Sequence, residues 1–226
     1  MKFERNHKLI EIECERAIVV GDIHGDYTTF SKVKNFIDKY FVVIFLGDYA
    51  DRGEFGIEII EEVYELTKKQ NVVALKGNHE DYSENGFPNF SPCDLIREAE
   101  IKKKSWKQYF HNFFKNFIDS LYLAAILNEK YLLIHGGISS KIKSKKDLSH
   151  PTKEIEEDVL WSDPYNGDGE YPNPRGAGVL FGKNITDTIC KILGIEKIIR
   201  SHEPIKAING VFYEHNEKVL TINSTT

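Results

Sequence analysis

The sequence contains few cysteines, and they lie far apart. Cys14, Cys93 and Cys190 form no CxxC pair, so neither a disulfide framework nor a thiolate zinc site is expected, and a reducing, cytoplasmic compartment is predicted. Long apolar runs are also missing. Those at 41–46 and 121–127 are well short of the roughly 18 residues of a membrane-spanning helix. The first ten residues do not contain the apolar core of a signal peptide.

An excess of positive charge is missing as well. The 226 residues include 30 Lys plus Arg against 35 Asp plus Glu, a formal net charge of −5. Such a chain is a poor candidate for non-specific binding to nucleic acids or membrane surfaces, so neither is expected as a partner. With 41% hydrophobic residues, the chain can bury a sizeable core without disulfides or metals. No linker clearly separates two parts, and a single domain over residues 1–226 is predicted.

Five short apolar runs predict strands that are buried on both faces. The runs are Ala17–Val20, Phe41–Leu46, Val72–Leu75, Tyr131–Ile134 and Lys197–Ile199. Apolar residues at spacings of three and four predict helices between the first runs. The helical positions are Phe30, Val33, Ile37 and Tyr40 in one pattern and 59–66 in the other. The β-α-β-α-β order of the first third indicates a parallel sheet and an α/β fold.

Three further segments carry structural predictions. A longer helix is expected over 94–120, with an aromatic stripe that is interpreted as core packing rather than as a ligand site. The stretch 163–174 is rich in turn residues and is expected to be a loop. Near the end of the chain, 207–213 and 218–223 are expected to pair as an antiparallel hairpin.

Each of the five runs is followed by polar residues of a similar kind. GDIHG follows the first, GDYADRG the second, GNHE the third, HGG the fourth and RSHE the fifth. Because ligands bind at the carboxyl ends of parallel strands, these segments can bring six side chains into one crevice. The six are Asp22, His24, Asp48, Asn78, His135 and His202. The interspersed glycines permit tight turns and close backbone approach there.

Carboxylate, imidazole and amide groups in this mixture suit divalent ions such as manganese, iron or zinc. Six ligands are too many for one open catalytic zinc site, but they fit a pair of ions that share one carboxylate. Two carboxylates, Asp22 and Asp48, against two dications leave a charge of about +2. This charge would attract an anionic substrate and acidify a bound water.

GDIHG, GDYADRG and GNHE, in this order, resemble the signature of the PPP-type serine/threonine protein phosphatases within the metallophosphoesterases. The resemblance continues through LYLAAILNEKYLLIHGGIS, LWSDP, RGAGVLFG and RSHEP and covers about residues 17–224. It implies a single catalytic domain with a central β-sandwich flanked by helices, the four-layer α-β-β-α metallophosphoesterase fold. The short chain resembles compact prokaryotic, especially archaeal, members.

The resemblance also implies a role for each matching residue. Asp22, His24 and Asp48 would bind the first metal, and Asp48, Asn78, His135 and His202 the second. Arg52 and Arg175, helped by Asn78, would bind the phosphoryl oxygens, and His79, oriented by Asp51, would act as general acid. The implied reaction is hydrolysis of a phosphomonoester in a protein or peptide by a hydroxide that bridges two divalent ions. Manganese is expected in vitro, with iron, zinc, cobalt or nickel as alternatives.

Two positions depart from the family pattern. Lys76 stands before GNHE where the family commonly has arginine, and the last residues, TINSTT, hold no counterpart of the family's SAPNY tyrosine. The chain is also shorter than the eukaryotic catalytic subunits of the family, so docking grooves for regulatory subunits and sensitivity to natural toxins are not carried over to it.

Two other functions stay open. A dinucleoside-polyphosphate or other nucleotide hydrolase could use the same scaffold, although the blocks at 160–182 and 200–204 favour a protein phosphatase. An inactive phosphate-binding scaffold would be expected to have lost a ligand or His79, and none is lost. The acidic charge argues against a nuclease or phosphodiesterase. Selectivity among phosphoserine, phosphothreonine and phosphotyrosine also stays open.

Overall fold

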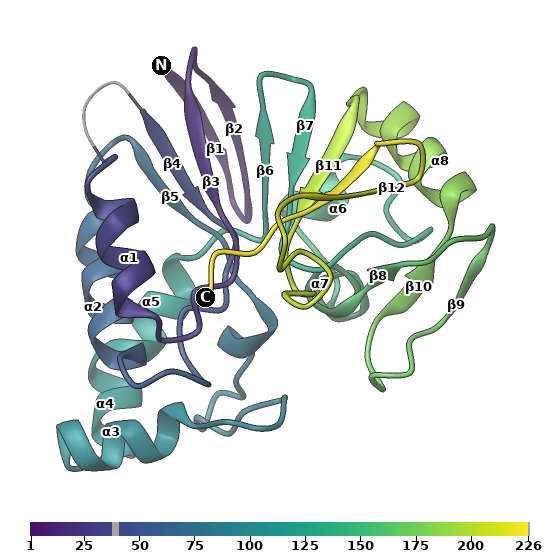
Figure 1. Cartoon of the computed structure of the whole chain (residues 1–226). Coiled ribbons are helices and arrows are strands. Elements are labelled where there is room, and N and C mark those ends of the chain that lie inside the picture. Colours follow the sequence, from purple (N-terminus) through teal and green to yellow (C-terminus); the bar gives the residue numbers. More distant parts are fainter. Residues whose placement is uncertain (38–40, 226) are drawn as a thin grey trace. The chain divides into compact units, whose positions relative to one another are not determined.

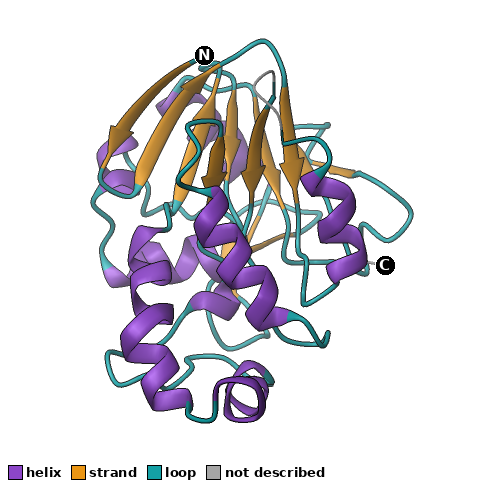
Figure 2. Cartoon of the chain, turned by 90° about the vertical axis from the view of Figure 1, so that its left-hand side faces the viewer, coloured by secondary structure: helices purple, strands orange, loops and turns teal. Residues whose placement is uncertain are grey.

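The computed structural model describes residues 1–37 and 41–225 of the chain, and these form two compact units. We name them the parallel-sheet unit, Arg16–Leu121 with Ser224–Thr226, and the mixed-sheet unit, Met1–Glu15 with Tyr122–Asn223. Figure 1 labels most of their helices and strands. Both units contain helices and strands (Figure 2), so the predicted α/β class is confirmed. Within the described ranges, no helix combines the length and hydropathy of a bilayer-spanning segment.

The sheet of the parallel-sheet unit is built from three of the predicted strands. β3 (Ala17–Val20), β4 (Val42–Phe45) and β5 (Val72–Ala74) pair in parallel, in that order. Helix α1 (Tyr27–Lys34) connects the first two strands, and α2 (Gly56–Leu66) connects the last two. All four apolar residues of β4 are buried, as expected for a strand covered on both faces. The β-α-β-α-β prediction is therefore confirmed.

Helix α1 is shorter than its apolar pattern predicts. The Asp26 carboxylate accepts a hydrogen bond from the Thr29 backbone N–H at 3.0 Å, which satisfies one of the donors left over in the first turn. The helix ends at Lys34, so Ile37 lies beyond it. Tyr40, the last position of the pattern, lies outside the described residues.

The single helix predicted over 94–120 is wrong, because the segment is interrupted. It consists of α3 (Leu95–Lys103), α4 (Trp106–Tyr109), a π-helical turn (Phe110–Phe114) and α5 (Lys115–Ser120). Lys104 has a left-handed backbone with φ of 69°, which ends α3. Ser105 is extended, and its side chain accepts a hydrogen bond from the Gln108 N–H at the start of α4.

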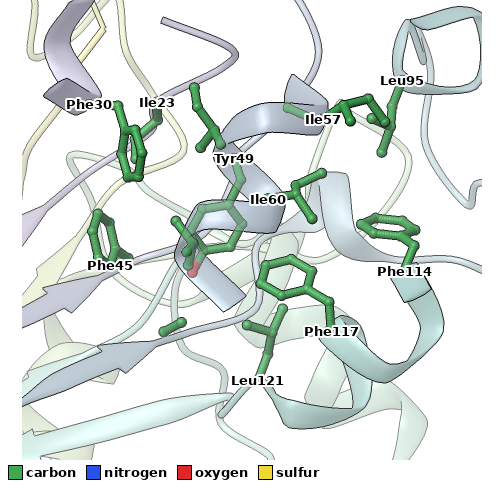
Figure 3. Packing of buried hydrophobic residues seen from close by; sticks show 14 of the residues in the cluster. Ile23, Phe30, Phe45, Tyr49, Ile57, Ile60, Leu95, Phe114, Phe117 and Leu121 are labelled. Atoms are coloured by element: carbon green, nitrogen blue, oxygen red, sulfur yellow. The ribbon is translucent and has the colours of Figure 1, made fainter. Parts of the chain in front are cut away.

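The core of the parallel-sheet unit is rich in aromatic rings (Figure 3). The stripe that was predicted to be core packing belongs to it, since Phe114 and Phe117 are fully buried. The Tyr49 ring meets Phe117 edge to face, with ring centroids 5.4 Å apart. The Tyr49 hydroxyl donates to the Leu75 carbonyl at 2.7 Å, so its polar end is satisfied inside the core. Because Tyr49 follows Asp48 directly, this packing fixes the loop that carries Asp48.

A seven-stranded sheet forms the mixed-sheet unit, in the order β1-β2-β6-β7-β11-β13-β12. Its strands are β1 (Lys2–Asn6), β2 (Leu9–Glu13), β6 (Ala124–Leu127), β7 (Tyr131–Leu133), β11 (Lys197–Arg200), β12 (Phe212–Glu214) and β13 (Val219–Thr221). The predicted runs β7 and β11 pair in parallel, and β12 and β13 form the predicted antiparallel hairpin. Residues 207–211, expected to extend that hairpin, form turns and irregular backbone, because the chain turns at Gly210 with φ of 119°.

Helices α6 (Lys145–Ser149), α7 (Lys153–Trp161) and α8 (Lys183–Leu193) complete the mixed-sheet unit. The prediction of a loop over 163–174 is wrong in part. β8 (Asp163–Pro164) and β9 (Glu170–Pro172) both pair with β10 (Val179–Phe181) in a small sheet. The local composition favours turns, but pairing with a strand further along the chain decides the backbone. Asp163 therefore lies on a strand.

Candidate active site

Three loops at the carboxyl ends of β3, β4 and β5 carry seven of the predicted residues. Six of the seven are buried, and Arg52 is exposed. They are Asp22 and His24 after β3, Asp48, Asp51 and Arg52 after β4, and Asn78 and His79 on a short 3-10 helix (Asn78–Glu80) after β5. The parallel order of the three strands brings these loops to one edge of the sheet.

His24 stands between two carboxylates. Its Nε2 lies 3.6 Å from Asp22 Oδ2 and 3.4 Å from Asp48 Oδ2, and this buried nitrogen has no hydrogen-bond partner among the described residues. Nδ1 donates to the Ala50 carbonyl at 2.9 Å, which leaves Nε2 as the ligand atom of the neutral ring. Burial lowers the pKa of His24, but the two carboxylates outweigh it and raise that pKa to about 9. This donor set fits a divalent cation in place of the proton.

The backbone at this edge adopts conformations that side chains rarely take. φ is positive at His24, Asp48, Asp51 and Arg52, at 45°, 55°, 66° and 65°. Non-glycine residues in this region are strained, and they persist only where surrounding contacts hold them. Such residues cluster at functional sites, so this edge of the sheet is a candidate site.

Glu80 and two glycines hold together the loops after β4 and β5. A Cβ on Gly47 would lie 2.3 Å from the Gly77 nitrogen, so only glycine permits this approach. Oε2 of Glu80 accepts from the backbone N–H groups of Asp48 and Gly77, each at 2.9 Å, and Oε1 accepts from that of Tyr49 at 3.1 Å. Burial and the Asp48 charge raise the pKa of Glu80 to about 7. Sequence reasoning missed this role, which only the last letter of GNHE could have signalled.

His79 and Asp51 form a second pair of side chains. Nδ1 of His79 donates to Asp51 Oδ2 at 2.6 Å. The other oxygen of Asp51 accepts from the backbone N–H groups of Asp94 and Leu95 at the start of α3, at 2.6 and 2.8 Å. Burial lowers the pKa of His79, but Asp48 and Asp51 together raise it above its usual 6.5. The carboxylate therefore orients the ring and favours its protonated form.

His24 with its two carboxylates and the His79–Asp51 pair belong to one cluster. The His24 and His79 rings meet edge to face, with centroids 4.9 Å apart. His24, Asp48 and His79 also offer ligand atoms within 4.8 Å of one another. Since Nδ1 of His79 is held by Asp51, Nε2 is the ring nitrogen that this contact leaves available.

In the mixed-sheet unit, two predicted ligands follow neighbouring parallel strands. His135 follows β7 and His202 follows β11, and His135 Nε2 lies 3.2 Å from His202 Nδ1. Burial, His135 and nearby arginines lower the pKa of His202 well below 6.5, although Asp163 opposes this. Two buried imidazoles this close provide a pair of nitrogen donors of the kind that zinc, iron and manganese accept.

Arg175, the second arginine predicted to bind phosphate, forms an ion pair with a carboxylate. Its Nε donates to Asp163 Oδ2 at 2.7 Å. Asp163 also accepts from Arg200 at 2.8 Å and from Asn173 at 3.0 Å, and its Oδ1 lies 3.9 Å from His202 Nε2. Burial raises the pKa of Asp163, but Arg200, His202 and Arg175 lower it below its usual range. Sequence reasoning noted WSDP and RSHEP but gave Asp163 and Arg200 no role.

Two curated relatives of this chain are named serine/threonine-protein phosphatases. A serine/threonine-protein phosphatase of Caenorhabditis elegans is 33% identical over 219 residues, which cover 91% of this chain and 46% of the relative. Serine/threonine-protein phosphatase T of Saccharomyces cerevisiae is 30% identical, over 98% of this chain and 45% of its own length. The chain thus spans about half the length of the curated relatives that it matches.

A solved structure and a family profile agree with these relatives. The structure is a serine/threonine phosphatase from Saccharomyces cerevisiae with similarity to a human phosphatase; it matches with a TM-score of 0.79 and 27% identity, over 97% of this chain and 72% of that chain. The profile of the calcineurin-like phosphoesterases matches residues 15–206. The chain therefore belongs to the calcineurin-like phosphoesterase family, with the metallophosphoesterase α/β fold, and its relatives are serine/threonine protein phosphatases of the PPP type that its motifs resemble.

Proposed function

We propose that this chain is a metal-dependent phosphatase that hydrolyses phosphoserine and phosphothreonine in proteins or peptides. The observation that carries the proposal is the buried cluster in which His24 lies between Asp22 and Asp48, with His79 and Asp51 beside it. The family supports metal-dependent hydrolysis of phosphoesters, and the names of the relatives support protein substrates. A cytoplasmic location is proposed from the cysteine usage alone.

The proposed metal ligands are those that the motifs imply. Asp22, His24 and Asp48 would hold one divalent ion, and Asp48, Asn78, His135 and His202 the other. Manganese is the ion to supply in vitro, with iron, zinc, cobalt and nickel as alternatives. When bound, such ions stabilise charge on phosphoryl oxygens and acidify a water molecule. This assignment takes residues 1–226 to be one catalytic domain.

The side chains of the protein would then bind the ester and supply a proton. Arg52 and Arg175, with Asn78, would bind the phosphoryl oxygens, because a planar guanidinium can donate two parallel hydrogen bonds. A serine or threonine alkoxide is a poor leaving group and needs a proton as the bond breaks. Since Nδ1 of His79 is held by Asp51, the proton on Nε2 is the one available for transfer.

Metal-dependent turnover of matched peptides tests the proposal. Metal-stripped protein is titrated with Mn²⁺ and assayed on one peptide sequence that carries phosphoserine, phosphothreonine or phosphotyrosine, and on diadenosine tetraphosphate. We expect metal-dependent release of phosphate from the first two peptides. Faster turnover of the phosphotyrosine peptide would overturn the serine/threonine assignment, and faster turnover of the dinucleotide would favour the nucleotide hydrolase. A protein that binds phosphate but hydrolyses no ester, p-nitrophenyl phosphate included, would be a scaffold.

A further inference from the structure

Two arginines of the mixed-sheet unit, Arg175 and Arg200, share the carboxylate of Asp163. They differ in how many of their guanidinium nitrogens make hydrogen bonds within the protein. Arg200 is fully buried. Its Nε donates to the Gly136 carbonyl, Nη1 donates to Glu203 at 2.5 Å, and Nη2 donates to Asp163 Oδ1 at 2.8 Å. Because all three nitrogens are bonded inside the protein, Arg200 has no donor to offer to a ligand.

Arg175 is bonded at one nitrogen. Its Nε donates to Asp163 Oδ2 at 2.7 Å, and its side chain is 42% exposed. Within the described residues, the two terminal nitrogens of Arg175 make no hydrogen bond. A guanidinium carries five N–H groups, so the bond to Asp163 uses one and leaves the outer edge of the plane for an anion.

Asn173 ties this arrangement to the backbone. Its Nδ2 donates to Asp163 Oδ2 at 3.0 Å, and its Oδ1 accepts from the Arg175 backbone N–H at 3.0 Å. The buried Asn173 side chain therefore holds both the Asp163 carboxylate and the main chain of Arg175. Arg175 is thus held at its backbone by Asn173 and at its Nε by Asp163.

We propose that Asp163 is a positioning residue that holds the Arg175 guanidinium by its Nε, so that the two terminal nitrogens are presented as a planar fork to the phosphate group. The proposal rests on the proposed function, in which Arg175 binds phosphoryl oxygens. A long, exposed arginine loses rotamer freedom when it binds an anion, and a bond already made at Nε removes part of that cost. Asp163 itself does not touch the phosphate.

A double-mutant cycle tests this assignment. Affinity for inorganic phosphate is measured by calorimetry on Mn²⁺-loaded wild type, D163N, R175A and the double variant, together with Mn²⁺ affinity and the unfolding midpoint. We expect D163N to weaken phosphate binding about 3- to 10-fold with Mn²⁺ affinity unchanged. In the R175A background, the same change should weaken it less than about twofold, because interacting sites are not additive.

Two further variants separate positioning from a structural role. E203Q also removes an acid partner of Arg200 but leaves Arg175 untouched, so phosphate affinity should stay at the wild-type value. D163E keeps the charge beside Arg200 but moves the carboxylate, so it should weaken phosphate binding and serves as the test if D163N unfolds. Equal losses from D163N in both backgrounds, a loss in E203Q, or tighter phosphate binding in D163N would overturn the proposal. Absence of turnover in the wild type would instead overturn the proposed function.

Discussion

His79 is the residue whose proposed role depends most on the leaving group. Replacing it by asparagine removes the Nε2 proton but keeps a polar side chain next to Asp51. We expect H79N to lose on the order of 10²–10⁴ in kcat on a phosphoserine peptide. The loss should be smaller on p-nitrophenyl phosphate, because nitrophenolate leaves with little need for a proton. Steady-state kinetics on both substrates, with Mn²⁺ affinity measured alongside, provide the comparison.

An equal loss on both substrates would remove the general-acid role of His79. A loss of Mn²⁺ affinity in H79N would instead indicate that His79 is a ligand, as its distance from His24 and Asp48 would allow. D51N is the companion variant, since the Asp51 carboxylate accepts hydrogen bonds from His79 and from the start of α3.

His215 makes the stability of the protein depend on pH. Thr186 Oγ1 donates to its Nδ1 at 2.7 Å, and its Nε2 donates to the Tyr165 carbonyl at 2.9 Å, so only the neutral ring satisfies both bonds. Burial lowers the pKa of His215. The unfolded chain therefore binds more protons below about pH 6.5, and the free energy of unfolding falls as the pH drops towards the folded-state pKa.

We expect the H215N variant to show a shallower fall in stability between pH 7 and pH 5 than the wild type. The slope from one site is at most about 1.4 kcal/mol per pH unit. Asparagine suits the left-handed backbone at this position, where φ is 52°. Urea unfolding at several pH values measures the slope, and H111N, at an exposed histidine, is the control. Identical slopes in wild type and H215N would contradict the prediction.

At the scale of the structural elements, the loops after β4 and β5 approach each other closely at Gly47 and Gly77. Gly47 has φ of 110°, and an added Cβ would meet the Gly77 nitrogen at 2.3 Å. We expect G47A to lower the free energy of unfolding by about 2–4 kcal/mol, because the neighbour is backbone and cannot move away. G194A is the matched control, since Gly194 also has positive φ but nothing within 4 Å.

Only the backbone strain should count in G194A, which we expect to cost about 1 kcal/mol. Chemical denaturation of both variants checks the difference. Similar losses would show that φ, rather than the close approach of the two loops, decides the need for glycine at position 47.

At the scale of the whole molecule, bound metal should contribute to stability. An ion that binds only the folded chain adds about 2.7 kcal/mol at one hundred times its dissociation constant. We expect Mn²⁺ to raise the unfolding midpoint of the wild type and to leave that of D48N nearly unchanged, because Asp48 is the proposed shared ligand. D187N, at an exposed aspartate that pairs with Lys218, should respond like the wild type. Equal midpoint shifts in D48N and the wild type would exclude Asp48 from the centre.

The sequence predicted the five strands that appear as short apolar runs within a single stretch of the chain. The predicted bounds of β3, Ala17–Val20, match the structure, and those of the other four runs differ from it by at most one residue at either end. A buried parallel strand is a short apolar run that ends in glycine and polar residues, and all of that is visible in one window. The motif residues after β3, β4 and β5 follow by the same reasoning, since the carboxyl ends of parallel strands share one edge.

Tertiary contacts decided the rest. The pairing of β8 with β10 depends on a strand further along the chain, and the composition of 163–174 does not show it. Glu80 and Asp163 appeared in the motifs as letters, but their roles come from partners in other loops. The sequence by itself determined which chemical groups this protein carries and which strands deliver them. Only the tertiary structure decided which buried carboxylates hold them in place, because those hydrogen bonds join residues that no local pattern connects.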